Sequence, residues 1–467
     1  MSQPDLATPT VEDLRSRVGG QVITVDDPAY EEARLVWNGM IDRRPALVVR
    51  PSSSEDVVAA LLLAREHDLL VSVRCGGHST PGYSSCDGGL VIDMRPMNRV
   101  QVDADARTAR VQGGASWAEL DAATQEHGLA VTGGRVSDTG VAGLALSSGS
   151  GWLERMYGVT CESLSSAEVV TADGRIVTAS AEENPDLLWG LRGGGGNFGV
   201  ATELEFRLHP VGPILAAGML LYSRAKAREV IRHYRDFIAS APEQVGGGVA
   251  LLTTPPEPFV PEEVRGQPAV GVVYCYVGPP EEGMEAATAL RGFGEPVADM
   301  IQPMPYAVVQ QMLDAGSPRG VREYFKVASL PDLPDAAIDT VAAQAENLPA
   351  PFGQLILGPM GGALTRSDAD TMALPVNGGA WTYFCLAMWM DPAEDERNTA
   401  WARGFHEAMR PFSGDTAPPN FIAADEGNAR LRASYGEDKY ARLSALKQRW
   451  DPDNLFRLNQ NILPSGA

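Results

Sequence analysis

The amino-acid sequence predicts an α+β fold in two domains, and three observations lead to this prediction. The chain has 467 residues, more than the roughly 250–300 residues that one hydrophobic core usually supports. Up to about residue 210, short strand-like runs alternate with helical patterns and glycine-rich turns. After Pro-Val-Gly-Pro at 210–213, longer helical patterns alternate with strand-like runs, which indicates a second domain.

The first domain is expected to contain a strand–helix–strand unit. Residues 46–50 and 70–74 are strand-like, and Ser52-Ser-Ser-Glu-Asp56 is typical of a helix N-terminus between them. Two later strands flank an Asp-Gly turn at 173–174, which predicts a hairpin. The remaining elements expected in this half are strands at 89–93, 100–103, 109–112, 164–171, 176–179 and 201–208, and helices near 10–14, 117–127 and 185–191.

The second half is expected to combine long helices with a sheet. Helical patterns cover 224–240, 281–293, 334–347 and 394–410, and strands are clearest at 249–253, 269–277 and 381–390. In the last run, alternation places Trp381, Tyr383, Cys385, Ala387 and Trp389 on one face, and Thr382, Phe384, Leu386, Met388 and Met390 on the other. Such a strand is either packed between helices or part of a sheet that covers a flat ligand.

Composition excludes several functional classes. The formal net charge of −22 disfavours binding to nucleic acids and to anionic membrane surfaces. The five cysteines form no CxxC pair, and the six histidines form no HxH or HxxxH motif, so neither a disulfide framework nor a metal site is expected. The first residues do not resemble a signal peptide, and no run approaches ~20 apolar residues. We therefore expect a cytoplasmic enzyme without a membrane span.

One glycine motif is not a dinucleotide fingerprint. Gly194-Gly-Gly-Asn-Phe-Gly199 contains GxGxxG, but that fingerprint requires a strand before it and a helix after it, so that a phosphate lies at the helix N-terminus. Here a helical pattern precedes and a strand pattern comes next. The context therefore argues against a Rossmann domain.

Three other glycine-rich segments indicate a large shared ligand. Arg74-Cys-Gly-Gly-His-Ser79 comes directly after a strand, and its glycines allow the backbone N–H groups to approach an anion such as a pyrophosphate. Gly140-Val-Ala-Gly-Leu144 and Gly149-Ser-Gly151 would let a planar ring lie against backbone. Taken singly, each is equally well explained as a packed turn. Their proximity in the chain favours one ligand.

These segments resemble those of FAD-linked oxidases with a PCMH-type flavin domain, the berberine bridge enzyme-like and 6-hydroxy-D-nicotine oxidase-like proteins. The similarity covers Arg74 to Asp93, Val141 to Leu153, Asn184 to Thr202 and Trp450 to Ile462. It implies a vanillyl-alcohol-oxidase-type α+β fold. The flavin domain would span 1–212, an antiparallel-sheet substrate domain flanked by helices would span 213–424, and residues 425–467 would return to the flavin domain.

The resemblance also implies a cofactor and its ligands. FAD would be bonded through its 8α-methyl group to His78, and by this bond alone, since Val136 stands where bicovalent relatives carry cysteine. The other residues that the resemblance assigns to FAD are Arg74, Cys75, Gly76, Gly77, Ser79, Gly82, Tyr83, Ser137, Thr139, Gly140, Gly143, Leu144, Gly151, Trp152, Gly199, Val200, Thr202, Asn459 and Asn461.

Two segments depart from the family pattern. Many relatives read Leu-Gly-Gly-Gly-Ile-Gly where this chain reads Leu146-Ser-Ser-Gly-Ser-Gly151, so we expect the side chains at 147 and 148 to narrow the ring pocket. Relatives often carry Tyr-x-Asn before the acidic pair at 425–426, and this chain has Pro419-Asn-Phe-Ile-Ala-Ala instead. A catalytic base cannot be transferred from that segment.

The implied activity is removal of a hydride from a small or medium-sized organic substrate, with O₂ reoxidising the flavin. Bacterial secondary metabolism on polyketide- or alkaloid-like compounds is the implied setting, in a monomer or homodimer. The candidate bases are Tyr274, Tyr276, Tyr324 and Lys326. The alternatives are a flavin dehydrogenase with another acceptor, flavin-N5-oxide or oxidative cyclisation chemistry, and a non-catalytic binding protein.

Overall fold

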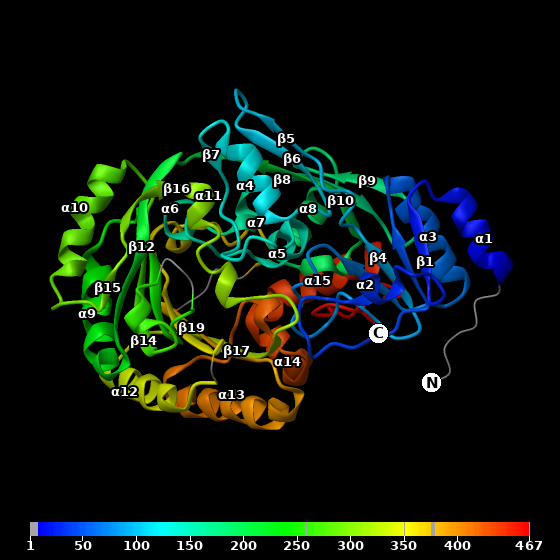
Figure 1. Cartoon of the computed structure of the whole chain (residues 1–467). Helices are drawn as coiled ribbons and strands as arrows, with labels where there is room; N and C mark the ends of the chain where they lie inside the picture. Colours follow the sequence, from blue (N-terminus) through cyan, green and yellow to red (C-terminus); the bar gives the residue numbers. More distant parts are fainter. Residues whose placement is uncertain (1–7, 257–259, 350, 375–378, 467) are drawn as a thin grey trace.

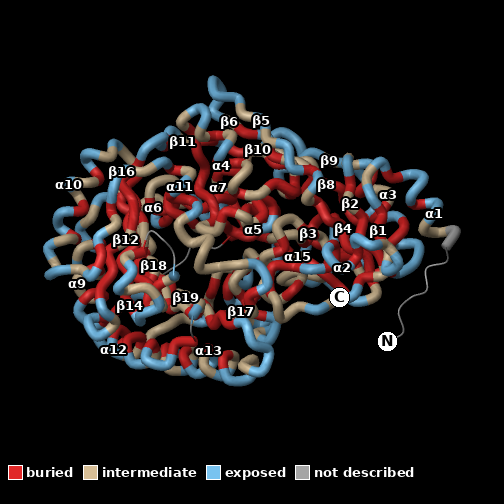
Figure 2. The backbone as a smooth tube through the Cα atoms, in the orientation of Figure 1, coloured by how far each residue is buried: buried red, intermediate tan, exposed pale blue. Residues whose placement is uncertain are grey.

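The computed structural model describes residues 8–256, 260–349, 351–374 and 379–466. The segments coloured from blue to teal-green, up to β10, and the red C-terminal segment form one half of the molecule, and the segments from green β12 to orange α13 form the other (Figure 1). Buried residues concentrate along the strands of both halves, and exposed residues cover the outer helices (Figure 2). None of the helices described has the length and apolar composition that a membrane span requires.

The first sheet has four strands in the order β1-β2-β4-β3. Strands β2 and β3 run parallel to β4, and β1 is antiparallel to β2. Helix α3 connects β2 to β3 and begins as predicted, because the Ser53 side chain accepts a hydrogen bond from the Asp56 N–H group. The elements of this part are α1 (Thr8–Arg17), β1 (Gln21–Thr24), α2 (Tyr30–Arg34), β2 (Leu47–Arg50), α3 (Ser54–Glu66), β3 (Val71–Arg74) and β4 (Leu90–Asp93).

The second sheet has five antiparallel strands in the order β5-β6-β10-β8-β9. Strands β8 and β9 form the predicted hairpin. The GxGxxG segment comes after a helix and precedes a strand, as expected from the sequence. The elements here are β5 (Val100–Asp103), β6 (Thr108–Gln112), α4 (Trp117–Gln125), β7 (Leu129–Ala130), α5 (Val141–Ser147), α6 (Glu154–Tyr157), α7 (Thr160–Ser163), β8 (Leu164–Val170), β9 (Ile176–Ala179), α8 (Pro185–Leu191), η1 (Gly195–Asn197), β10 (Val200–Arg207) and β11 (His209–Pro210).

The C-terminal helices α14 (Gly427–Tyr435) and α15 (Glu437–Trp450) pack into the same buried cluster as α8. One ion pair fixes the last residues of the chain after α15. The fully buried Nζ of Lys447 lies 2.6 Å from Oδ2 of Asp451, and it also donates hydrogen bonds to the carbonyl oxygens of Asn197 and Phe456. The C-terminal segment is thereby held against the η1 turn.

The third sheet is the largest, with β15-β12-β14-β13-β18-β19-β17 in order and β16 beside β12. Four helices cover one of its faces, and the other face is turned toward the first half (Figure 1). Its strands are β12 (Ile214–Ser223), β13 (Val245–Thr253), β14 (Pro268–Tyr276), β15 (Ala298–Asp299), β16 (Gln302–Pro305), β17 (Arg322–Leu330), β18 (Gln354–Pro359) and β19 (Trp381–Trp389). The helices of this half are α9 (Ala227–Ser240), α10 (Pro280–Arg291), α11 (Tyr306–Val309), α12 (Asp335–Gln344) and α13 (Asp395–Met409), of which α9, α10, α12 and α13 form the outer layer.

The predicted elements are found within a few residues of their expected ends, and the α+β fold class is confirmed. The elements that were not predicted are strands β1, β7, β11, β12, β15, β16, β17 and β18 and helices α2, α5, α6, α7, α11, α14 and α15. The interpretation of residues 381–390 as a strand packed under helices is confirmed for one face of β19. The interpretation of its other face as the cover of a flat ligand stays a prediction. Met390 falls one residue beyond the strand.

Candidate active site

Two of the predicted glycine loops touch each other. A Cβ added to Gly76 would lie 2.3 Å from the backbone N of Gly140, and a Cβ added to Gly140 would lie 2.3 Å from the sulfur of Cys75. Only glycine allows this approach. Segments 64 residues apart in the chain are thus brought into one surface, as a shared ligand requires.

His78 stands at the edge of this surface with its side chain 16% exposed. Its Nε2 lies 2.7 Å from Oδ1 of Asp138, and its ring stacks on Trp37 with centroids 5.0 Å apart. Asp138 in turn pairs with Arg319, whose Nε lies 2.8 Å from Oδ2. Burial alone would raise the pKa of Asp138, but the hydrogen bond from His78 and the charges of His78 and Arg319 outweigh it, so the pKa is lowered.

Open space adjoins α5 and the η1 turn, and two unpaired polar atoms belong to the C-terminal segment that contacts η1. A Cβ at Gly143 or at Gly196 would meet no atom within 4 Å. The Oδ1 atoms of Asn459 and Asn461 are buried, and neither finds a hydrogen-bond partner in the part of the chain that the structure describes. Buried acceptors without donors are rare in folded proteins. A flat ring that carries an imide N–H group, such as an isoalloxazine, fits the open space and offers a donor for one of these acceptors.

Arg74 does not present its charge to this surface. The side chain is 1% exposed, pairs with Asp93 at 2.7 Å and donates to the carbonyl oxygens of Ala33 and Leu35. Its predicted contact with a pyrophosphate therefore does not follow from the geometry. The groups of this loop that can bind an anion are therefore its backbone N–H groups.

Several predicted contact residues shape the loops instead. Ser79 accepts hydrogen bonds from the backbone of Gly82 and Tyr83, and Gly82 has a positive φ of 79° and packs on Ile41. Burial raises the pKa of the Cys75 thiol to about 11, so this cysteine is an uncharged packing group. Gly77 has a positive φ of 82°.

Two other predicted contact residues, Ser137 and Trp152, connect the first half of the molecule to the second. Ser137 donates a 2.6 Å hydrogen bond to Asp314 of the second half. Trp152 packs in a buried cluster with Val273 and Cys275 of β14. The carbonyl oxygen of Thr139 accepts a hydrogen bond from the backbone N–H group of Trp117. The remaining predicted contact residues pack against neighbouring backbone or side chains within the first half; they are Leu144, Gly151, Gly199 and Val200.

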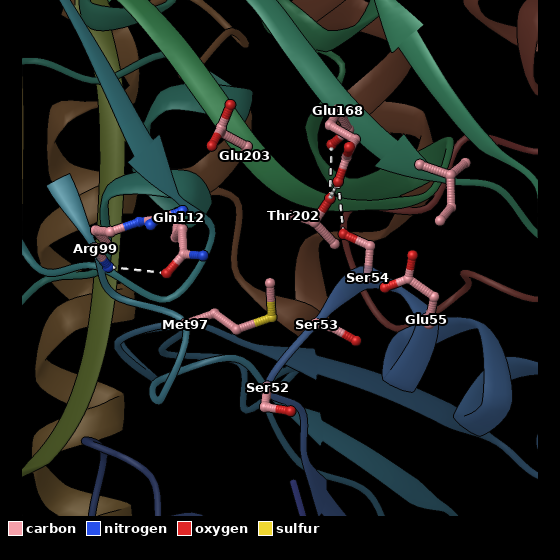
Figure 3. A pocket seen from close by; sticks show the side chains of 11 residues that line it. Ser52, Ser53, Ser54, Glu55, Met97, Arg99, Gln112, Glu168, Thr202 and Glu203 are labelled. Carbon is pink, nitrogen blue, oxygen red and sulfur yellow. Dashed lines mark hydrogen bonds between the residues drawn. The ribbon is translucent and has the colours of Figure 1, made fainter. Parts of the chain in front are cut away.

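Thr202 lies away from the two loops. Its hydroxyl donates a 2.7 Å hydrogen bond to Glu168, and its side chain lines a groove of about 320 Å³ beside Ser54 and Glu55 (Figure 3). Among the predicted FAD contacts, only Thr202 lines this groove, which has carboxylates on both sides.

The four predicted bases point away from the loops. Tyr274 and Tyr276 lie in the buried cluster on the helix-covered face of the large sheet, where their hydroxyls donate to the carbonyl oxygen of Gly283 and to Glu282. Tyr324 and Lys326 share that face through their register with Ala387 and Cys385. The side chains of both bind Asp425. The geometry therefore gives these four residues structural contacts and no place above the glycine loops.

In β17, β18 and β19, the alternate residues lie on the opposite face of the sheet, which is turned toward the first half (Figure 1). We call these the site-facing positions, and they are Glu323, Phe325, Val327, Ser329, Gln354, Ile356, Gly358, Thr382, Phe384, Leu386 and Met388. Phe325 and Phe384 both pack edge-on against Phe421. These positions are mainly apolar, and Glu323 is the one ionisable residue among them.

Glu323 is buried at the junction of the two halves. Its Oε2 accepts a 2.7 Å hydrogen bond from Thr80, two residues after His78, and its backbone is held by Asn38. Desolvation raises the pKa of Glu323 to about 7. A carboxyl group with this pKa changes protonation state near neutral pH.

A second link joins the segments that depart from the family pattern. The hydroxyl of Ser148 donates a 2.9 Å hydrogen bond to Oδ1 of Asn420. Asn420 precedes Phe421, so this bond fixes the aromatic cluster over the loop that ends α5. A hydrogen bond therefore connects the two segments, 146–151 and 419–424, that differ from the family pattern.

Comparison with known proteins matches this architecture. The model of an FAD binding domain family matches residues 45–180, and the model of a family described as berberine and berberine like matches residues 419–463. The chain is similar to the berberine bridge enzyme-like FAD-linked oxidoreductases in both of these segments. Both matched segments contain residues of the loop surface described above.

Whole-chain relatives of this family agree. The chain is 29% identical over 463 residues to (R)-6-hydroxynicotine oxidase of Paenarthrobacter nicotinovorans, covering 96% of this chain and 98% of the relative. It is 28% identical over 458 residues to an uncharacterised FAD-linked oxidoreductase of Bacillus subtilis, with 96% and 98% covered. The structure of 6-hydroxy-D-nicotine oxidase from Arthrobacter nicotinovorans superposes with a TM-score of 0.86 at 27% identity, covering 98% and 99%. The protein is accordingly an FAD-linked oxidoreductase.

Sequence reasoning missed Asp138, Arg319, Trp37, Glu323 and Asn420. A signal existed for one of them. Glu323 begins the sequence Glu-Tyr-Phe-Lys, and period-two alternation places it opposite Tyr324 and Lys326. The pattern could not tell which face met the flavin half. The other four residues depend on contacts between distant segments.

Proposed function

We propose that this protein is an oxidase that removes a hydride from a small or medium-sized organic molecule. The observation that carries the proposal is the junction between the glycine loops of the first half and an apolar face of the large sheet. This junction includes open space and unpaired asparagine oxygens. An apolar cover excludes water from a redox centre, and a few polar groups orient the substrate.

FAD fits this junction, and we propose that it is attached to His78 by a single covalent bond. The loop 75–79, the start of α5, Asn459 and Asn461 would hold it. Bound FAD supplies the hydride acceptor. Val136, in place of a cysteine, supports one bond rather than two.

The chain's own groups then bind, orient and move a proton. The site-facing phenylalanines and Phe421 would pack against the substrate. We propose Glu323 as the group that accepts the proton of a substrate O–H or N–H, because it is the one ionisable side chain among the site-facing positions and its pKa near 7 suits a base at neutral pH.

A cytoplasmic location and a monomeric or homodimeric state are also proposed, as expected from the sequence. Further parts of the proposal rest on the resemblance alone. They are O₂ as the electron acceptor and a setting in bacterial secondary metabolism on polyketide- or alkaloid-like compounds. The division into a flavin domain (1–212), a substrate domain (213–424) and a returning segment (425–467) is proposed on the same basis. The packing of α14 and α15 beside α8 supports the last boundary.

A substrate-free experiment tests the redox proposal. The purified yellow protein is reduced with dithionite under argon and mixed with air-saturated buffer in a stopped-flow instrument. Reoxidation within seconds with release of hydrogen peroxide is expected of an oxidase. A protein that stays reduced for minutes contradicts the oxidase proposal and supports a dehydrogenase with another acceptor.

The attachment is tested separately. Acid-precipitated wild-type protein should remain yellow and carry the added mass of one flavin nucleotide. His78→Ala should release the colour into the supernatant. An adduct that survives in His78→Ala would contradict the assignment of the linkage.

A further inference from the structure

His78 is held by a network that spans both halves of the molecule. Asp138, from the loop before α5, binds Nε2 of His78 at 2.7 Å through Oδ1. Its other oxygen, Oδ2, pairs with Nε of Arg319 at 2.8 Å. Arg319 stands just before β17 and also donates a 3.0 Å hydrogen bond to the carbonyl oxygen of Gly76. The arginine of one half thus bridges two loops of the other.

The network fixes the orientation of the imidazole. Trp37 stacks on one face of the ring at an interplanar angle of 24°, and Asp138 anchors its Nε2 edge. Nδ1 has no hydrogen-bond partner among residues 8–256, 260–349, 351–374 and 379–466. One nitrogen is therefore bound to a carboxylate, and the opposite nitrogen is left as a free nucleophile.

We propose that Asp138 is the positioning residue for attachment of FAD to His78, and that Arg319 holds Asp138 in place from the substrate half. This inference rests on the proposed covalent linkage. A carboxylate on one imidazole nitrogen fixes the tautomer and stabilises the positive charge that develops when the other nitrogen attacks.

Attachment is an oxidation whose atoms and electrons balance. Nδ1 of His78 forms a C–N bond to the 8α carbon, one C–H bond of that methyl group breaks and releases its proton, and the proton on Nε2 passes to Asp138 and then to solvent. The two electrons released enter the ring system and are taken by dioxygen, which leaves as hydrogen peroxide with two protons. Asp138 is needed while the imidazole carries its positive charge, so its loss should slow attachment more than it weakens FAD binding.

The position of Arg319 adds a second consequence. Because Arg319 belongs to the segment that leads into the large sheet, Asp138 is fully held only when the two halves are docked. Attachment would then come after docking, and the covalent bond would form only in a chain whose substrate-binding half is already in place.

The test measures attachment directly. Full-length chain produced without flavin is mixed with FAD in air, and the covalent fraction is measured over time by intact-protein mass spectrometry after acid quench. Asp138→Asn should slow attachment at least about tenfold, while reversible FAD binding, measured by fluorescence quenching, changes less than about threefold. Arg319→Gln should slow attachment less, and Asp138→Glu and Arg319→Lys should restore part of the rate.

Asp339→Asn is the matched control, because it breaks an exposed ion pair with Arg228 on the outer helices. It should leave attachment unchanged. If Asp138→Asn and Arg319→Gln bind FAD and attach it at the wild-type rate, the inference is overturned while the linkage stands. If wild-type protein carries no adduct at His78, the proposed linkage itself fails. Equal losses of binding and attachment in Asp138→Asn would assign Asp138 a purely structural role and also overturn the inference.

Discussion

The hydroxyl of Thr80 donates a 2.7 Å hydrogen bond to Oε2 of Glu323, and this bond connects the loop after His78 to the edge strand of the large sheet. No cation pairs with the carboxyl group of Glu323 among the residues that the structure describes. A buried carboxyl group with a single hydroxyl partner holds its proton more firmly than it would in water. The junction of the two halves therefore contains a group that titrates near neutral pH.

Glu323 should make the stability of the protein depend on pH. Burial raises its pKa to about 7, whereas the unfolded chain ionises the same group near its ordinary value of about 4.3. Between these values the folded state holds more protons than the unfolded state, so the free energy of unfolding falls as pH rises from about 4 to about 7. Glu323→Gln should remove this fall in the free energy of unfolding. The change in that free energy caused by the substitution should therefore be more favourable at pH 8 than at pH 4 by on the order of 3 kcal/mol.

Urea unfolding of wild-type and variant protein at a series of pH values measures this difference. Glu281→Gln, at an exposed site on α10, serves as the control. Parallel curves for wild type and Glu323→Gln across the whole range would refute a raised pKa.

The contact between the glycine loops should tolerate no side chain. In Gly140→Ala the new methyl group would lie 2.3 Å from the Cys75 sulfur and the Gly76 nitrogen, and such overpacking costs about 1–3 kcal/mol. Gly143→Ala places its methyl group in open space, so the fold should keep its stability. If FAD occupies that space, Gly143→Ala should weaken FAD binding about tenfold. Thermal unfolding of the flavin-free chain and FAD titration separate the two effects.

The buried pair of Lys447 and Asp451 should be essential to the C-terminal segment. Both side chains are 0% exposed, and removing one partner of a buried pair typically costs about 3–5 kcal/mol. Lys447→Met should therefore destabilise the protein strongly and loosen the segment that carries Asn459 and Asn461. Arg449→Ala, which breaks the exposed pair with Asp186, should cost at most about 1 kcal/mol. Similar urea midpoints for the two variants would contradict this prediction.

The tyrosines on the helix-covered face should be dispensable for turnover. Tyr276→Phe removes only a hydroxyl bonded to Glu282, so kcat on any substrate that reduces the flavin should stay within about twofold. Glu323→Gln should lower the rate of flavin reduction by about 10²-fold or more, the usual contribution of a general base. A large loss in Tyr276→Phe, with Glu323→Gln fully active, would reverse the proposed roles.

Much of the fold was accessible from local patterns. The strand–helix–strand unit, the β8–β9 hairpin and the alternation in β19 are set by interactions between residues close in the chain, and these predictions are confirmed. The glycine segments were also recognisable, because residues without a Cβ mark places where backbones approach closely. Strands β12 and β18 were missed because the apolar runs of Ile214–Ser223 and Gln354–Pro359 do not alternate clearly between apolar and polar residues.

The sequence alone determined that this chain is an FAD-linked oxidoreductase, and it predicted that the glycine-rich loops beside His78 hold the flavin. Only the tertiary structure decided which side chains face that site. Alternation groups Tyr324 with Lys326 and Glu323 with Phe325, but the helices packed on one side of the sheet determine which group is buried away from the loops. Likewise, the contacts of Asp138 with Arg319 and of Ser148 with Asn420 join residues far apart in the chain. Such pairings depend on how the two halves pack, and no local pattern encodes that.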